Sequence, residues 1–185
     1  MNNSQQRSRN GEQEQVKFNR KHEAKKEYAR WLKQIDWKVF CTFTYAWRVS
    51  DPQADKTFIE FINRLERSLK SNVGYVRGDE KRFSGCGKPA SARHYHAVLT
   101  SAIPLEPTWV ASLWMEMAGH RSDHAGAKVD TYNPAANGIE YVLKFISQPE
   151  GDWKFGRLEL FHPEARSLHT VNARWNRRLR RIKAR

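Results

Sequence analysis

Residues 93–100 read Arg-His-Tyr-His-Ala-Val-Leu-Thr, a stretch with the composition of a β-strand. Successive side chains of a strand point to opposite faces of the sheet, so residues two apart share a face. His94 and His96 are therefore predicted to share one face, and Tyr95 is predicted to point to the other. Two imidazoles on one strand face can bind a divalent cation without help from a flexible loop.

The rest of the chain divides into strand-like and helix-like segments. β-Branched and aromatic residues favour strands, and apolar residues at spacings of three and four favour helices. The predicted strands are residues 37–45, 73–79, 92–100 and 127–131. The predicted helices are residues 17–34, 51–70, 107–117 and 133–146.

Helix start and stop signals support this division. Asp51-Pro52 and Asn133-Pro134 are each typical of an N-cap followed by a first-turn proline. Gly119 is placed to end the third helix. The order strand, helix, strand, strand, helix, strand, helix fits a ferredoxin-like (RRM-like) α+β sandwich. We expect an antiparallel sheet with the helices packed on one face.

Length and composition bound the domain organisation and the partners. The chain has 185 residues, 39% of them hydrophobic, and a net charge of +13. These values fit one domain, residues 17–165, with tails. Residues 1–16 hold almost nothing to bury and are expected to be disordered. The charge favours a polyanionic partner, although a merely solvated basic surface is the plainer alternative.

The cysteines and the apolar segments bear on location. The chain has two cysteines, Cys41 and Cys86, and no CxxC metal pattern, which favours a reducing compartment. The first residues lack the apolar stretch of a signal peptide, and no apolar run approaches the length of a membrane span. We therefore expect a cytoplasmic protein with no membrane partner.

Residues 166–185 are predicted to form a basic amphipathic helix, with apolar residues at spacings of three and four. The arginines expected to contact DNA phosphates are Arg174, Arg177, Arg178 and Arg181. The apolar stripe could equally dock on the domain with the arginines solvated, and a membrane-surface helix has the same pattern. Trp47 and Arg48, after the first strand, are candidates to stack on or clamp unpaired bases.

The histidine pair needs a third ligand to hold a metal. Glu80, at the end of the second strand, is the best-placed carboxylate, and Asp79 is the alternative because a one-residue change of register exchanges them. Two imidazoles and one carboxylate leave coordination positions open for phosphate oxygens. This donor set suits Mn²⁺ or Mg²⁺, although it would also bind Zn²⁺ or Ni²⁺. A histidine pair that is packed or simply solvated is the plain alternative.

Tyr141 and Lys144 are the candidate nucleophile and its cationic partner. They lie one helical turn apart, close enough to act on one phosphate. Only about one free phenol in a thousand is ionised at pH 7, a deficit of roughly 4 kcal/mol that a nearby cation or a metal-polarised phosphate must offset. With the histidines, they suggest a metal-assisted tyrosine nuclease; a half-buried tyrosine and a solvated lysine are the alternative.

Three blocks resemble, in order, the motifs of the HUH single-strand endonucleases, most closely the rolling-circle replication initiators with one catalytic tyrosine. Phe40 to Tyr45 (FCTFTY) resembles the first motif, a strand beside the metal site. Arg93 to Val98 (RHYHAV) resembles the His-hydrophobic-His motif, and Tyr141 to Lys144 (YVLK) resembles the Tyr-x-x-Lys motif. The resemblance spans about residues 37–150.

The resemblance implies residue roles. A metal bound by His94, His96 and Glu80 would polarise the scissile phosphate of single-stranded or hairpin origin DNA. Tyr141 would attack this phosphate to give a 5′-phosphotyrosine link and a free 3′-OH, and Lys144 would stabilise the developing charge. Arg93 would contact the DNA. A later 3′-OH could reseal the strand without ATP, as rolling-circle replication requires.

Other functions remain open at this stage. Residues 85–89 (GCGKP) lack the Ser or Thr that a nucleotide-binding loop needs after its lysine, so unwinding is expected from a helicase of a bacterial or archaeal host. A transposase or relaxase of the same superfamily would share the chemistry. A non-catalytic nucleic-acid-binding module would account for charge and topology, but would not need His94, His96 and Tyr141 to converge.

Overall fold

The computed structural model describes residues 23, 25–47, 49–80, 94–119, 126–144 and 152–162. All of these lie within the predicted domain, residues 17–165. Several predictions fall outside the described residues: the tail 1–16, the segment 166–185, Cys86, Arg48, Arg93, Arg174, Arg177, Arg178 and Arg181.

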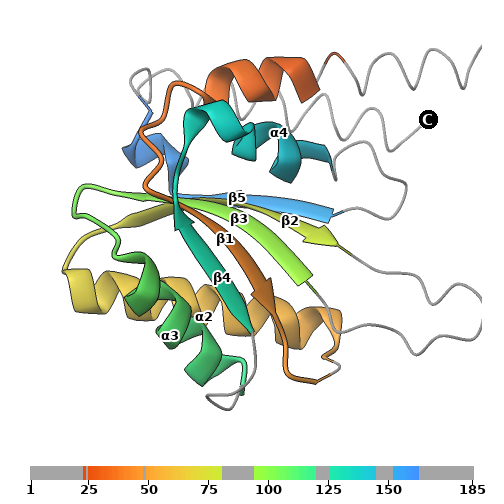
Figure 1. Cartoon of the computed structure of the whole chain (residues 1–185), viewed down its shortest axis with the longest axis vertical. Coiled ribbons are helices and arrows are strands. Elements are labelled where there is room, and N and C mark those ends of the chain that lie inside the picture. Colours follow the sequence, from red (N-terminus) through yellow and green to blue (C-terminus); the bar gives the residue numbers. More distant parts are fainter. Residues whose placement is uncertain are drawn as a thin grey trace, which may run out of the picture.

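A five-stranded antiparallel sheet forms the centre of the fold (Figure 1). Its strands are β1 (Val39–Thr44), β2 (Val73–Glu80), β3 (His94–Ser101), β4 (Ala127–Thr131) and β5 (Asp152–Gly156). The strand order is β4-β1-β3-β2-β5, and every neighbouring pair is antiparallel. The four predicted strands are confirmed, and the α+β topology is consistent with a ferredoxin-like fold.

Strand β5 was not predicted from the sequence. It pairs with β2, where Phe155 lies opposite Val76 and Trp153 lies opposite Gly78. Five residues with a single alternation give too short a signal to separate a strand from a loop. A close tertiary contact accompanies this pairing, because Gly156 packs against the Tyr75 ring. A Cβ at this position would come within 2.7 Å of the ring.

Helices α2 (Asp51–Leu69) and α3 (Pro107–Met117) cover one face of the sheet and confirm two helix predictions (Figure 1). The N-cap of α2 is Ser50 and not the predicted Asp51, because the Ser50 hydroxyl accepts a hydrogen bond from the Gln53 amide. Helix α3 ends before Gly119, whose φ of +74° lies in the left-handed region that favours glycine.

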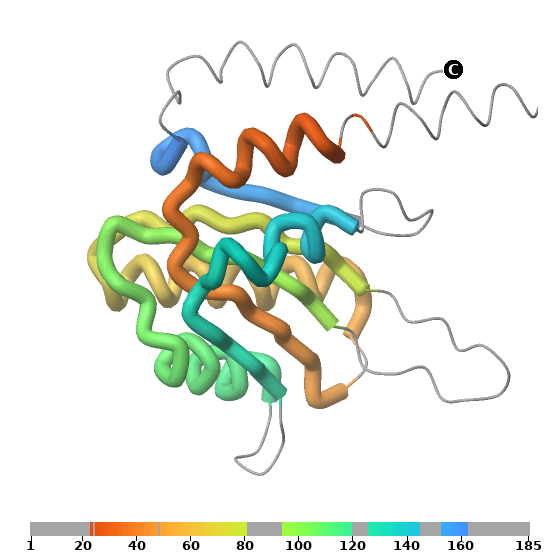
Figure 2. The backbone as a smooth tube through the Cα atoms, turned by 45° about the horizontal axis from the view of Figure 1, so that its top comes forward, coloured from red at the N-terminus to blue at the C-terminus, as the bar shows by residue number. Residues whose placement is uncertain are grey.

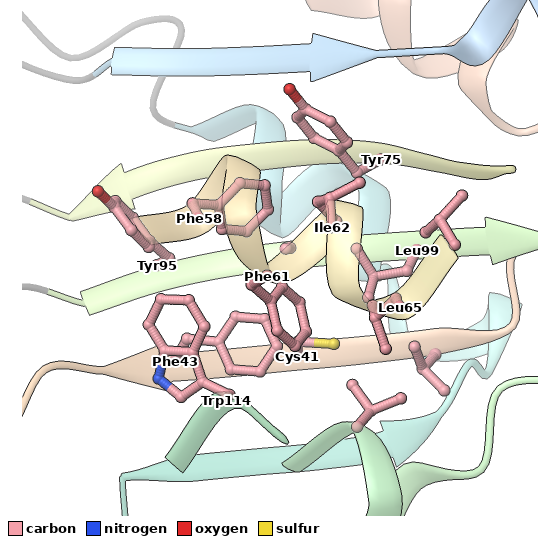
Figure 3. Packing of buried hydrophobic residues seen from close by; sticks show 14 of the residues in the cluster. Cys41, Phe43, Phe58, Phe61, Ile62, Leu65, Tyr75, Tyr95, Leu99 and Trp114 are labelled. Atoms are coloured by element: carbon pink, nitrogen blue, oxygen red, sulfur yellow. The ribbon is translucent and has the colours of Figure 1, made fainter. Parts of the chain in front are cut away.

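An aromatic core fills the space between this face and its two helices (Figure 3). Trp114 of α3 stacks on Phe43 of β1 with ring centroids 4.5 Å apart. Its indole N–H donates to the Thr44 carbonyl oxygen at 3.0 Å. Phe58 of α2 packs edge-on against the Tyr95 ring, 5.8 Å away. Tyr95 thus faces away from the histidines, as strand alternation predicted.

The prediction that the helices pack on one face is wrong. The helical residues 25–32 (helix 25–32) and α4 (Gly138–Leu143) cover the opposite face (Figures 1 and 2). They form a second core in which Leu32, Val76 and Val98 are buried. The physical reason lies in the central strands β2 and β3, which are buried along almost their whole length and so need cover on both faces.

The last predicted helix, residues 133–146, begins later than expected, and residues 145 and 146 lie outside the described residues. The cap-and-proline signal at Asn133 starts only a 3₁₀ turn, Pro134–Ala136, in which the Asn133 side chain accepts a hydrogen bond from the Ala135 amide. Asn137, with φ +54°, separates this turn from α4. A Cβ at Gly138 would lie 3.0 Å from the Phe40 ring, so glycine allows α4 to approach β1 closely.

We predict that Trp114→Ala lowers the free energy of unfolding by about 3–5 kcal/mol, because it removes a fully buried indole and leaves a cavity against Phe43. Urea denaturation followed by circular dichroism measures this change. Ile59→Ala on the same layer is the control: Ile59 is 44% exposed, and its loss should cost less than about 0.5 kcal/mol. Equal stability of the two variants would contradict the core assignment.

Candidate active site

The pairing of β1 with β3 holds the two predicted histidines. His96 lies opposite Thr42, and His94 lies opposite Thr44. The Thr42 hydroxyl oxygen is 3.2 Å from Nδ1 of His96, and the Thr44 hydroxyl oxygen is 2.8 Å from Nδ1 of His94. With each Nδ1 hydrogen-bonded to a hydroxyl, a metal ion would be bound through Nε2, and the hydroxyls would fix the ring orientations.

Glu80 is the carboxylate that the structure places beside the histidines. It lies opposite His94 in the β2–β3 register, and its Oε2 is 3.1 Å from Nε2 of His96. Asp79 lies opposite Tyr95 and faces the other side of the sheet, where its Oδ1 is 3.0 Å from Nε of Arg77. Of the two carboxylates that the sequence left open, only Glu80 can reach the histidine face.

Helix α4 brings the candidate nucleophile to the same place. The Tyr141 and His96 rings are 4.7 Å apart between centroids, at an interplanar angle of 81°. Nζ of Lys144 lies 3.7 Å from the centroid of the Tyr141 ring. Tyr141 is 41% exposed, so a substrate can reach it, whereas the next residue, Val142, is fully buried and anchors the helix. The predicted tyrosine and lysine thus lie at the histidine face.

The surroundings of His96 favour its neutral form. Burial lowers the pKa of His96 and outweighs the opposing effect of the hydrogen bond and charge of Glu80, and Lys144 and His94 lower it further. A neutral imidazole is the form that binds a metal ion. Burial of this ring therefore prepares it as a ligand.

The side chains that meet here are the donor set predicted from the sequence, and the identity of the cation stays a prediction. Two imidazole nitrogens and one carboxylate suit Mn²⁺ or Mg²⁺ with phosphate oxygens completing the coordination. The hydrogen bond between Nε2 of His96 and Oε2 of Glu80 requires a proton between them, and a cation would replace that proton. Among the described residues, no three histidine, cysteine or acidic side chains are grouped as ligands around one point.

One predicted DNA contact lies apart from this cluster. Trp47 is 55% exposed and packs against Gly119, where a Cβ would come within 1.7 Å of the indole. Gly119 follows α3, the helix on the face opposite to α4.

The contacts of Thr42 and Thr44 with the histidines were not predicted from the sequence. The spacing of two between these threonines in the first block could have indicated that both face the histidines.

Comparison of the chain with protein-family models, curated proteins and solved structures found no match. Within the described residues, no helix has both the length and the apolar character required to cross a membrane. A functional assignment therefore rests on the residues and their geometry.

We predict that Glu80→Gln and Asp79→Asn have opposite effects on metal binding and stability. Glu80→Gln should weaken Mn²⁺ binding by more than about 100-fold, since even partners of metal ligands are worth 10–100-fold, and should change stability by less than about 1 kcal/mol. Asp79→Asn should leave Mn²⁺ binding unchanged and cost about 3 kcal/mol, because Arg77 loses a buried partner. Titration calorimetry and urea denaturation measure both quantities, and the reverse pattern would contradict the register.

We predict that Thr42→Val or Thr44→Val weakens Mn²⁺ binding by about 10–100-fold, because the partner that orients an imidazole is lost while the shape of the side chain is kept. Electron paramagnetic resonance of free Mn²⁺ gives the affinity. Thr131→Val, an exposed threonine of β4, is the control and should bind Mn²⁺ like the wild type. Unchanged affinity in both site variants would rule out the orienting role.

Proposed function

We propose that the protein is a metal-dependent endonuclease that nicks and rejoins single-stranded DNA through a covalent link to Tyr141, as HUH endonucleases do. The observation that carries this proposal is the position of the Tyr141 ring, 4.7 Å from that of His96. A phenol, an imidazole and a carboxylate from three separate elements meet there, with Lys144 at the phenol ring. A module that only holds nucleic acid would not require this convergence.

In the proposed reaction, the Tyr141 phenol loses its proton to water, which its exposure allows. The phenolate oxygen attacks the scissile phosphorus, the bond from phosphorus to the 3′ oxygen breaks, and that oxygen takes a proton to become a 3′-OH. The strand on the 3′ side stays attached as a 5′-phosphotyrosine. The Lys144 ammonium, which lies at the Tyr141 ring, stabilises the negative charge that develops on the phosphate.

The metal site of the proposal consists of His94, His96 and Glu80, with Mn²⁺ or Mg²⁺ as the cation. When bound, the cation supplies Lewis-acid polarisation of the scissile phosphate. The protein's own part is to keep both imidazoles oriented by Thr42 and Thr44, and to keep His96 neutral through burial.

We infer that this chemistry serves the initiation of rolling-circle replication. The phosphotyrosine link conserves the energy of the phosphodiester, so a later 3′-OH can displace Tyr141 and reseal the strand without ATP. The substrate would be single-stranded or hairpin origin DNA, which the net charge of +13 favours. A host helicase would supply unwinding, and a transposase or relaxase would use the same site chemistry.

We predict that wild-type protein with Mn²⁺ and a pool of 3′-labelled single-stranded oligonucleotides from candidate origins gives a labelled adduct that survives denaturing electrophoresis. Tyr141→Phe should give no detectable adduct, because the attacking oxygen is absent. Tyr132→Phe, which keeps Tyr141, is the matched control and should retain the adduct, and EDTA should abolish it.

Two outcomes would count against the proposal. An adduct that persists in Tyr141→Phe would place the nucleophile elsewhere. If no candidate origin oligonucleotide gives an adduct, and His96→Ala binds DNA as well as the wild type does, the protein would be a non-catalytic binding module.

A further inference from the structure

We propose that a shallow groove between helix 25–32 and α4 binds the phosphate backbone of the single strand that reaches Tyr141. The residues that line this groove are Lys25, Lys26, Ala29, Arg30, Lys33 and Glu140. Four of these six are cations and one is a carboxylate. The proposal rests on the proposed function for the identity of the polyanion, but its binding can be measured without the cleavage reaction.

The groove follows from how helix 25–32 is oriented. Tyr28 packs edge-on against the Trp153 ring of β5 at 4.8 Å, and Leu32 is buried in the second core. These contacts fix the rotation of the helix about its axis. Lys25, Ala29 and Lys33 recur every four residues and therefore share the flank that faces α4. Helix 25–32 lies on the same face of the sheet as α4 (Figure 2). Packing of its apolar side chains therefore leaves the basic ones along the groove beside α4.

The charges in the groove are only partly neutralised. Lys33 forms a salt bridge with Glu140, which joins the helix to α4. Lys26 is 3.2 Å from Glu23, in an exposed pair that contributes little and that a phosphate can replace. Among the described residues no carboxylate forms a salt bridge with Lys25 or Arg30, although the charge of Lys25 helps to lower the pKa of Glu140. These two cations are therefore the ones most available to a phosphate.

The position of the groove relates it to the reaction. Glu140, at its wall, directly precedes Tyr141 on α4. Lys144 caps the other end of the same helix, with its Nζ 3.7 Å from the centroid of the Tyr141 ring. A strand with its scissile phosphate at Tyr141 would have Lys144 beside the cleavage point and the cations of helix 25–32 across the groove from Glu140. A positively charged groove that follows the backbone is how proteins bind single strands without reading sequence.

The test compares two double variants with the same loss of positive charge, both in full-length protein carrying Tyr141→Phe and with EDTA present. Lys25→Glu with Arg30→Glu alters the groove. Lys56→Glu with Lys70→Glu alters exposed lysines of the α2 segment, on the opposite face of the sheet. Fluorescence anisotropy with a labelled oligodeoxythymidine gives the dissociation constant over a range of salt concentrations.

We expect the groove variant to bind about tenfold more weakly than the parent at 150 mM salt, because two phosphate contacts are lost. The magnitude of its salt slope should fall by about 1.4, since each contact to a single strand contributes about 0.7. The control should bind within about twofold of the parent. Lys25→Gln with Arg30→Gln, which avoids new negative charge, should show a smaller weakening and the same decrease in slope.

Equal weakening of the groove variant and the control would overturn the proposal, because net charge alone would then explain the effect. The proposal would also be overturned if the glutamine double variant kept its melting temperature and bound the oligonucleotide as tightly as the parent. Tighter binding of a duplex than of a single strand of the same length would overturn it too. The two proposals fail separately. If the groove variant loses binding and wild-type protein forms no adduct, the groove proposal stands and the nuclease proposal fails. If wild-type protein forms the adduct and the groove variant binds as tightly as the parent, the nuclease proposal stands and the groove proposal fails.

Discussion

The antiparallel register between β1 and β3 is the constraint on which both the core and the site depend. It sets Thr42 opposite His96 on one face, and Phe43 opposite Tyr95 on the other. A slip of one residue would move the side chains of one strand to the other face, placing either the imidazoles in the aromatic core or Phe43 at the surface of the site. Stacking of Trp114 on Phe43 opposes that slip, so core packing and ligand orientation are enforced by the same pairing.

A buried charge cluster fixes the neighbouring strand. Arg77 is 1% exposed, lies 4.1 Å from the centroid of the Tyr95 ring, and pairs with both Asp79 and Asp55. A buried guanidinium without partners would be very costly, so Arg77 and Asp79 must stay on the α2 face together. Alternation then directs Glu80 to the histidine face. The Arg77–Asp79 ion pair on the α2 face thereby determines that Glu80 is the carboxylate on the histidine face.

The sequence was sufficient to predict elements that have a local signal. It was not sufficient where tertiary contacts determine the register or the bounds of an element. The alternation in β3 and the apolar spacing in α2 and α3 were sufficient for most of the sheet and its crossover helices. Glu80 could not be separated from Asp79, because the register depends on where Arg77 finds its partners. Strand β5 and helix α4 each contain a glycine that packs against a ring far away in sequence, Gly156 against Tyr75 and Gly138 against Phe40. The second helical layer was detectable, because Ala97 to Leu99 shows no alternation, a pattern typical of a strand covered on both faces.

The second layer positions the candidate chemistry. Helix α4 has six residues, and a helix of that length is not stable alone in water. Its place is therefore set by burial of Ile139 and Val142 against the sheet, and Tyr141 projects from a segment whose conformation is tertiary in origin. The Lys33–Glu140 pair ties the same helix to the basic groove. A strand held in the groove would thus be held relative to Tyr141, because one packed layer supports both the proposed phosphate contacts and the proposed nucleophile.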